Sequence, residues 1–319
     1  MYEFKMAMKF TRTGFRLTCY FQRTNRMVHT VADEELTDYC DWMKHFDSRA
    51  YPLQNIAMCK MKGKGQPTIL TDKWPHFSCT AIKINTPCFP SSSQWSSRLL
   101  LLSDSEEKFA DFLHDSKVLQ EGALIAGIDS VTNTHLDNVA KNMFPRWQKT
   151  SNYPLKLFYL SGTVEDMPTR MNVSGLDDNE YFVDKLTPDH AGLVGSYYKR
   201  INEDPTIIEK YFQHIISLYD LTAGIFKRSD PSNPIAWTLY GDLGKAIHMC
   251  IIPEHRGKGL VSVLGKFLFT QLVQQKIIPV LDHYIYGVLS ETKFTKHIMH
   301  YSVDRAWRDS ATGKCRWLD

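Results

Sequence analysis

The chain has 319 residues, of which 43% are apolar, so it can form one large or two moderate globular units. The formal net charge of +3 excludes a strongly basic surface of the kind that binds nucleic acid. No apolar run approaches the roughly 18 residues that a membrane-spanning helix needs. Seven scattered cysteines without a Cys-x-x-Cys pair argue against a disulfide framework or a zinc site. We therefore expect a soluble intracellular protein without a bound metal.

Residues 1–30 form a basic segment in which Glu3 is the only acidic residue before Asp33. Its cations fall on helical spacings of three, four and seven residues: Lys5, Lys9, Arg12, Arg16, Arg23 and Arg26. This pattern predicts an amphipathic helix of the mitochondrial transit peptide type, and hence a mitochondrial protein. The alternative is a loosely ordered basic extension of a cytoplasmic protein.

Residues 31–170 are interpreted as an N-terminal α/β domain. Helices are predicted over residues 33–46, 106–113 and 134–142, and strands over 54–60, 68–71, 79–84 and 155–160. In the first helix one face carries Leu36, Tyr39, Cys40 and Met43. The basic, glycine-rich residues 62–67 are expected to form a hairpin turn between two strands, with a phosphate-binding loop as the alternative. Leu99 to Leu102 is interpreted as a strand end or a helix start.

Residues 171–319 are interpreted as a C-terminal domain with a clearer order of elements. Two helices are predicted over residues 188–198 and 205–217, after a short strand end at 184–186. Three antiparallel strands follow over 221–226, 235–240 and 245–252. Next come a helix from Leu260, a strand at 278–281, a helix over 293–301 and closing strands near 306 and 316–318.

The segment that follows the third of these strands has the composition of an anion site. It consists of Arg256, Gly257, Lys258 and Gly259, and the helical pattern begins at once with Leu260. Glycines let the backbone approach a ligand closely, and the N–H groups of a helix N-terminus favour negative charge. Two cationic side chains add full positive charge beside these donors. The sequence therefore predicts a binding site for a phosphate-bearing ligand, although it matches neither the P-loop nor the G-x-G-x-x-G pattern.

This turn resembles the pyrophosphate-binding turn of the GNAT acyl-CoA N-acyltransferases, whose pattern is Gln/Arg-x-x-Gly-x-Gly/Ala. Arg256, Gly259 and Val261 occupy the marked positions, and Val261 departs from the small residue expected there. Three further segments are similar to the glycine N-acyltransferases: Asp72-Lys73-Trp74-Pro75 with Phe77, residues 234–239 with Trp237, and Pro253-Glu254-His255-Arg256 followed by Gly259-Leu260-Val261. The resemblance covers residues 33–319 and is strongest over 234–265.

The resemblance implies an α/β fold with a GNAT-type mixed, mostly antiparallel sheet flanked by helices, preceded by a second α/β domain. It implies acyl-CoA as cosubstrate, held by Met249 and Ile251 of the strand and by Arg256, Gly257, Lys258, Gly259, Leu260 and Val261 of the turn. The reaction it implies is transfer of an acyl group to the amino group of glycine or another amino acid. Only small-molecule partners and a monomeric chain are expected.

The resemblance implies a glutamate as the general base at the start of the third strand. This chain departs from that pattern, because it has Lys245 at the position. We expect His248 as the substitute base, since an imidazole titrates near neutrality. Strand alternation places His248 and Lys245 on opposite faces, but a bulge at this point would change that. Asp242 is a further candidate base, and Tyr301 matches the tyrosine that protonates the leaving thiolate. A satisfied half-buried histidine and an aromatic core residue are the alternatives for His248 and Tyr301.

Two other functions remain compatible with the sequence. The first is a GNAT acetyltransferase that acts on an amine of a protein or a polyamine. The second is a CoA-binding paralogue without catalysis, which the departures at Lys245 and Val261 motivate.

Overall fold

The computed structural model describes the backbone of most of the chain. The described residues are 3–11, 14–22, 28–90, 93, 96–115, 117–118, 124–143, 147–149, 153–159, 176–198, 203–282, 299–303, 307–309 and 315–316. Within these ranges no helix has both the length and the apolar character needed to cross a bilayer.

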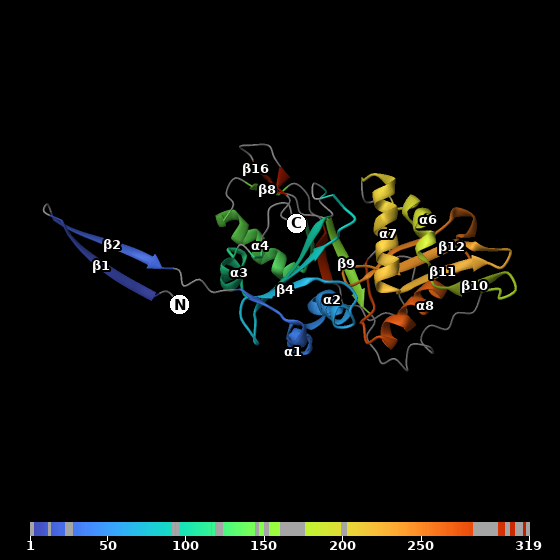
Figure 1. Ribbon diagram of the computed structural model, residues 1–319, viewed down its shortest axis with the longest axis horizontal. Helices are drawn as coiled ribbons and strands as arrows, with labels where there is room; N and C mark the ends of the chain where they lie inside the picture. The colour runs from blue at the N-terminus through green and yellow to red at the C-terminus, as the bar shows by residue number, and fades with distance from the viewer. Residues whose placement is uncertain are drawn as a thin grey trace.

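The N-terminal segment forms a β-hairpin rather than a helix. Strand β1 (Glu3–Thr11) pairs antiparallel with β2 (Gly14–Gln22), from Glu3 opposite Gln22 to Phe10 opposite Phe15 (Figure 1). The predicted amphipathic helix is therefore wrong for residues 3–11 and 14–22. Apolar residues at every second position of β1, namely Phe4, Met6, Met8 and Phe10, favour a strand over the helix that the spacing of the cations predicts. The mitochondrial location stays a prediction.

The first globular unit opens with helical elements. They are η1 (Asp33–Glu35), α1 (Leu36–Met43), η2 (Lys44–Ala50) and α2 (Tyr51–Met61). The helix predicted over residues 33–46 is confirmed, and its apolar face is buried. The strand predicted over 54–60 is wrong, because these residues belong to α2, where Ala, Met, Gln and Lys are good helix formers and Pro52 lies in the first turn. Residues 62–67 therefore connect a helix to a strand and do not form a hairpin turn.

A five-stranded sheet forms the centre of this unit. Its order is β3 (His29–Thr30), β4 (Thr68–Thr71), β5 (Cys79–Asn85), β6 (Ser97–Ser103) and β7 (Leu124–Ile128). Helices α3 (Glu106–Leu113) and α4 (Ser130–Met143) pack on one face, with Leu99 and Leu101 of β6. Leu100 and Leu102 pack on the other face with residues of α1 and α2. Because both faces of β6 are buried, its apolar run is continuous and carries no periodicity.

Two three-stranded sheets join distant parts of the chain. One has the order β14 (Val280–Asp282), β9 (Tyr153–Tyr159), β15 (Met299–Val303), and the other β17 (Cys315–Arg316), β16 (Trp307–Asp309), β8 (Trp147–Lys149). Strand β9 thus pairs with two strands from beyond residue 170, and the division of the chain at that residue stays a prediction. The helix predicted over 293–301 is wrong at its end, which lies in β15, while residues 293–298 lie outside the described ranges.

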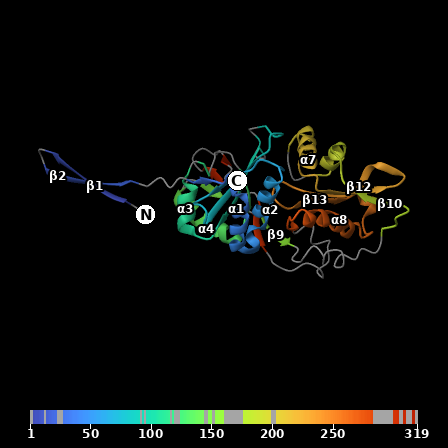
Figure 2. The ribbon, with the colours of Figure 1, turned by 60° about the horizontal axis from the view of Figure 1, so that its bottom comes forward.

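The second globular unit is built on a four-stranded antiparallel sheet. Its order is β10 (Tyr181–Asp184), β11 (Thr222–Lys227), β12 (Asp230–Tyr240) and β13 (Ala246–Ile251). Helices η4 (Pro188–His190), α6 (Ala191–Ser196) and α7 (Pro205–Tyr219) lie on one side of the sheet. Helix α8 (Leu260–Gln274), which follows η5 (Pro253–His255), lies on the other side (Figure 2).

The element order predicted for this unit is confirmed from α6 to β14. Two helices, three antiparallel strands, the glycine turn, a helix and a strand follow one another as expected. The strand end predicted at residues 184–186 is observed slightly earlier, as β10. The fold class is therefore confirmed as α/β, with mostly antiparallel sheets flanked by helices and a second α/β unit in front.

The two units meet at α2 and at the turn before β13. The Asn55 side chain, which is 1% exposed, donates from Nδ2 to the carbonyl oxygens of Gly244 (2.9 Å) and Ile278 (2.7 Å). Its Oδ1 accepts from the Ile278 N–H at 2.9 Å. Gly244 has φ of +71°, and a Cβ there would lie 2.1 Å from the carbonyl oxygen of Pro52, so only glycine fits. This contact fixes the turn that leads into β13.

Candidate functional site

A β-bulge interrupts the pairing of β12 with β13. Trp237 lies opposite Cys250 and Leu239 lies opposite Ile247, so one residue of β12 faces two residues of β13. The extra residue coincides with His248, whose φ is +48°. Positive φ is uncommon for residues other than glycine, and strained backbone of this kind is found at functional sites. The bulge interrupts the alternation of side chains along β13. The alternation that placed His248 and Lys245 on opposite faces of the sheet therefore does not hold across this point.

The His248 imidazole lies between β13 and the helices α6 and α7. Its Nε2 is 2.8 Å from the carbonyl oxygen of Val194. A carbonyl only accepts, so Nε2 carries the hydrogen and Nδ1 is the basic nitrogen of the neutral ring. Three aromatic rings surround the imidazole, with centroids at 4.9 Å for Tyr198, 5.2 Å for Phe212 and 6.0 Å for Trp237. His248 is thus half-buried and hydrogen-bonded, and its role as a base stays a prediction.

The turn between η5 and α8 presents backbone donors and cations on the surface. Gly257 and Gly259 have φ of +78° and +72°, the left-handed region that glycine adopts at little cost. Nothing lies within 4 Å of a Cβ built at either glycine, so the space above both is open. The exposed Arg256 donates from Nε to the Ile251 carbonyl at 3.1 Å, and the exposed Lys258 donates from Nζ to the Tyr181 hydroxyl at 3.1 Å. Such a turn before a helix of 15 residues can bind a phosphate group.

The remaining predicted ligand contacts divide into backbone and side-chain positions. Leu260 and Val261 are 1% and 7% exposed, so their side chains belong to the core and only their backbone can contact a ligand. The valine that departs from the GNAT pattern therefore does not crowd the surface of the turn. Met249 and Ile251 lie on β13, an edge strand whose ladder partner within the described residues is β12 alone.

Asp242, the further candidate base, is held in a buried ion pair. Its Oδ1 accepts from Arg98 Nη1 at 2.9 Å and from the Tyr211 hydroxyl at 3.3 Å, and its Oδ2 pairs with Arg98 Nη2. Arg98 and Asp242 are 1% and 4% exposed. Burial disfavours the charge of Arg98, but the Asp242 carboxylate outweighs this and raises the pKa of Arg98. The carboxylate is therefore committed to Arg98 and is a poor base, which corrects the expectation.

For the two other predicted catalytic residues, Lys245 and Tyr301, the structure describes the position of the backbone but no side-chain contact that indicates a catalytic role. Lys245 is 7% exposed and directly precedes β13, and its carbonyl accepts from the Gly241 N–H at 2.9 Å. Tyr301 belongs to β15, where its backbone pairs with Leu155, and its side chain lies outside the described part of the structure. The expectation that Tyr301 ends a helix is wrong. Catalytic roles for both residues stay predictions.

The His255 side chain lies beneath the turn and is kept neutral. It is 6% exposed, and its Nδ1 is 3.4 Å from the Tyr181 hydroxyl. Burial lowers the pKa of His255, and the positive charges of Lys227 and Lys258 lower it further.

This depressed pKa predicts a loss of stability in mild acid. Because the unfolded chain takes up the proton first, stability is present above the unfolded pKa of about 6.5 and falls as the pH drops below it. Urea unfolding at pH 8 and pH 5.5 measures the effect. We expect a His255→Gln variant to lose less stability over this interval than the wild type, and equal losses would contradict the assignment.

No protein-family model and no curated protein matches the sequence. Among solved structures, the chain is similar to the X-ray structure of a Drosophila protein from a structural genomics programme. The TM-score is 0.64 at 13% identity, over 87% of this chain and 98% of the other. A tandem GNAT protein from the clavulanic acid biosynthesis pathway has a TM-score of 0.49 at 11% identity, over 88% and 98% of the two chains. A GCN5-related N-acetyltransferase from Kribbella flavida has a TM-score of 0.44 at 11% identity, over 80% and 93%.

These similarities bear on the fold and not on the site. The two proteins with acyltransferase descriptions have TM-scores below 0.5, which is too distant to support an argument about function. The Drosophila protein shares the fold over nearly the whole length of both chains. The chain therefore has a two-unit α/β fold that occurs in at least one other solved protein.

Proposed function

We propose that the protein binds acyl-CoA and transfers its acyl group to the amino group of a small amine, with glycine or a related amino acid as the acceptor. The observation that carries the proposal is the turn at residues 256–259. It combines two glycines at positive φ, open space above both of them, two exposed cations and the first backbone N–H groups of α8. Such an arrangement suits the phosphate oxygens of a pyrophosphate group.

The neighbouring strand supports the transfer step. In this proposal the pantetheine arm runs along the edge of β13, where Met249 and Ile251 supply backbone groups, and the thioester reaches the bulge. His248 Nδ1 takes a proton from the ammonium of the acceptor, so that the neutral amine attacks the thioester carbon. The C–N bond forms and the C–S bond breaks. The nitrogen then loses a second proton, which the leaving thiolate takes up, so that the products are the amide and the free CoA thiol. Holding both reactants at the bulge supplies proximity.

The resemblance of the turn to the GNAT and glycine N-acyltransferase patterns supports the same reaction. So does the order of elements from α6 to β14, which is the GNAT order that the resemblance implies. The acceptor and the mitochondrial location rest on the sequence alone.

Substitution of Arg256 tests the phosphate site. We expect Arg256→Ala to weaken binding of benzoyl-CoA about tenfold or more, because a charge-assisted hydrogen bond to the pyrophosphate is lost. Calorimetry with the full-length chain measures the dissociation constant. The control is Lys210→Ala, which removes the same charge from an exposed position on α7 and is expected to bind like the wild type. Equal affinities of all three proteins would contradict the site.

Release of the CoA thiol tests the reaction. Benzoyl-, acetyl- and long-chain acyl-CoA are each supplied with and without glycine. Glycine-dependent release is the expected result. Binding of acyl-CoA without release with any amino acid would favour a CoA-binding protein without catalysis, and release with polyamines or protein amines alone would favour the other alternative.

A further inference from the structure

The indole nitrogen of Trp237 is a buried donor without a partner. The residue is 0% exposed, and its Nε1 has no hydrogen-bond partner among the described residues. Buried N–H groups in native proteins are nearly always paired, so an exception needs an explanation. One explanation is a ligand that supplies the missing acceptor.

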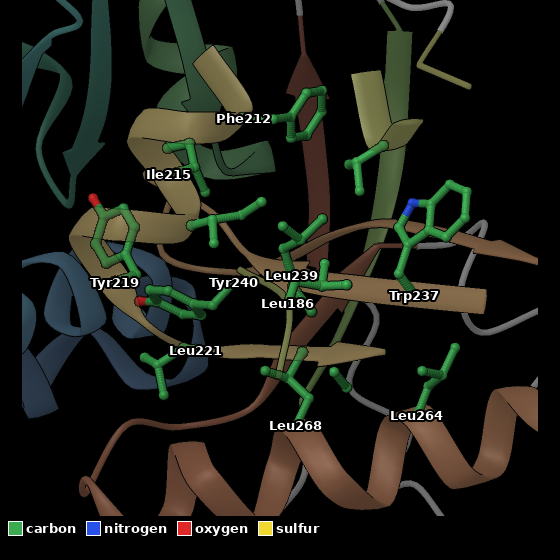
Figure 3. Packing of buried hydrophobic residues seen from close by; sticks show 14 of the residues in the cluster. Leu186, Phe212, Ile215, Tyr219, Leu221, Trp237, Leu239, Tyr240, Leu264 and Leu268 are labelled. Carbon is green, nitrogen blue, oxygen red and sulfur yellow. The ribbon is translucent and has the colours of Figure 1, made fainter. Parts of the chain in front are cut away.

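Trp237 lies on the side of the sheet that carries His248. Figure 3 shows its ring on the same side of β12 as Phe212 of α7, with Leu264 and Leu268 of α8 on the opposite side. The helix whose N-terminus holds the glycine turn is thus across the sheet. A ligand atom that reaches Trp237 Nε1 is therefore not part of the pyrophosphate.

Two neighbours define what surrounds the Trp237 ring. The Tyr197 ring packs edge-on against the indole at 5.4 Å and is itself 39% exposed. The His248 ring lies at 6.0 Å. The indole therefore sits between an aromatic side chain that faces solvent and the candidate base.

We propose that Trp237 determines acceptor specificity, with Nε1–H donating to a carboxylate oxygen of the amine acceptor, whose amino group points toward His248. Because the indole is 0% exposed, the acceptor reaches Nε1 only when the exposed Tyr197 side chain moves aside. This inference rests on the proposed function. The centroids of the Trp237 and His248 rings are 6.0 Å apart. A ligand that hydrogen-bonds to both rings must therefore have its acceptor oxygen and its amino group within a few bonds of each other. An α-amino acid has this arrangement. The indole donor would then select amino acids over simple amines, because the latter leave it unpaired.

The variant Trp237→Phe tests the role, since it removes the N–H and keeps an aromatic ring. We expect the KM for glycine to rise about tenfold, the loss of one hydrogen bond to the substrate. The dissociation constant of acyl-CoA should stay unchanged. With ethylamine, which has no carboxylate, wild type and variant should react alike.

The matched control is Trp42→Phe. The Trp42 Nε1 donates to the Phe77 carbonyl at 2.9 Å, so its loss breaks a hydrogen bond of the protein. We expect this variant to have a lower melting temperature and an unchanged KM for glycine. The melting temperature of Trp237→Phe is also expected to fall, because the smaller ring leaves a cavity in the core. The KM for glycine, and not the melting temperature, therefore distinguishes the two variants.

An NMR measurement keeps the test independent of turnover. The seven tryptophans give indole N–H signals, and Trp237→Phe identifies the one from Trp237. Glycine added to the CoA-loaded wild type should shift that signal, and ethylamine should not. No shift at saturating glycine, or an unchanged KM for the variant, would overturn the inference. A weakened affinity for acyl-CoA in the variant would instead assign Nε1 to the thioester carbonyl. Absence of acyl-CoA binding by the wild type would mean failure of the proposed function itself.

Discussion

An Asp242→Ala variant is expected to lose about 3–5 kcal/mol of unfolding free energy, because it leaves a buried arginine without its counter-charge. Arg98 comes from β6 of the first unit and is 1% exposed, and Asp242 precedes β13 of the second. The variant also leaves the Tyr211 hydroxyl without its acceptor in this pair. Urea unfolding followed by circular dichroism measures the loss.

Two further variants distinguish the cost of an unpaired buried charge from the loss of an ordinary ion pair. The double variant Arg98→Met with Asp242→Leu removes both charges and is expected to recover most of the stability, since a buried ion pair is worth little net free energy against apolar residues. The surface pair of Lys185 and Asp220, at 2.6 Å, is the matched control. Lys185→Ala should cost at most about 1 kcal/mol. An equally small loss in Asp242→Ala would contradict the role given to the buried pair.

A His248→Asn variant is expected to lower kcat by about 10²- to 10⁴-fold, the usual contribution of a general base. Asparagine tolerates positive φ better than other residues, so the bulge should keep its backbone conformation. The dissociation constant of acyl-CoA should therefore stay close to that of the wild type. Single-turnover release of the CoA thiol with saturating glycine measures the chemical step.

The competing base is Lys245, at the position of the family's glutamate. A Lys245→Met variant keeps an unbranched, buried side chain without the amine, which suits a residue that is 7% exposed. Near-normal turnover in Lys245→Met together with the loss in His248→Asn would support His248. The reverse pattern would assign the proton transfer to Lys245.

Local chemistry in the sequence determined the elements of the second unit. Helix α7 was predicted from its periodicity and from Pro205 at its start, and the structure adds the Asp204 cap, whose Oδ1 accepts from the Thr206 N–H at 2.8 Å. The glycine turn was equally readable, since Gly257 and Gly259 adopt the positive φ that glycine permits. Such signals lie within a few neighbouring residues, so the sequence alone carries them.

The features that shape the candidate site depend on contacts between residues far apart in the chain. The bulge at His248 arises from the register of β13 against β12, and the ion pair of Asp242 joins residues 144 positions apart. That Trp237 Nε1 has no hydrogen-bond partner among the described residues can be seen only when all of its neighbours in the folded chain are known. In the same way, β6 could not be told from a helix until both of its faces were covered. The sequence by itself determined the turn that can hold a phosphate, whereas the tertiary structure decided which side chains surround His248 at the bulge. The physical reason is that register, burial and charge pairing are properties of the packed chain and not of any local segment.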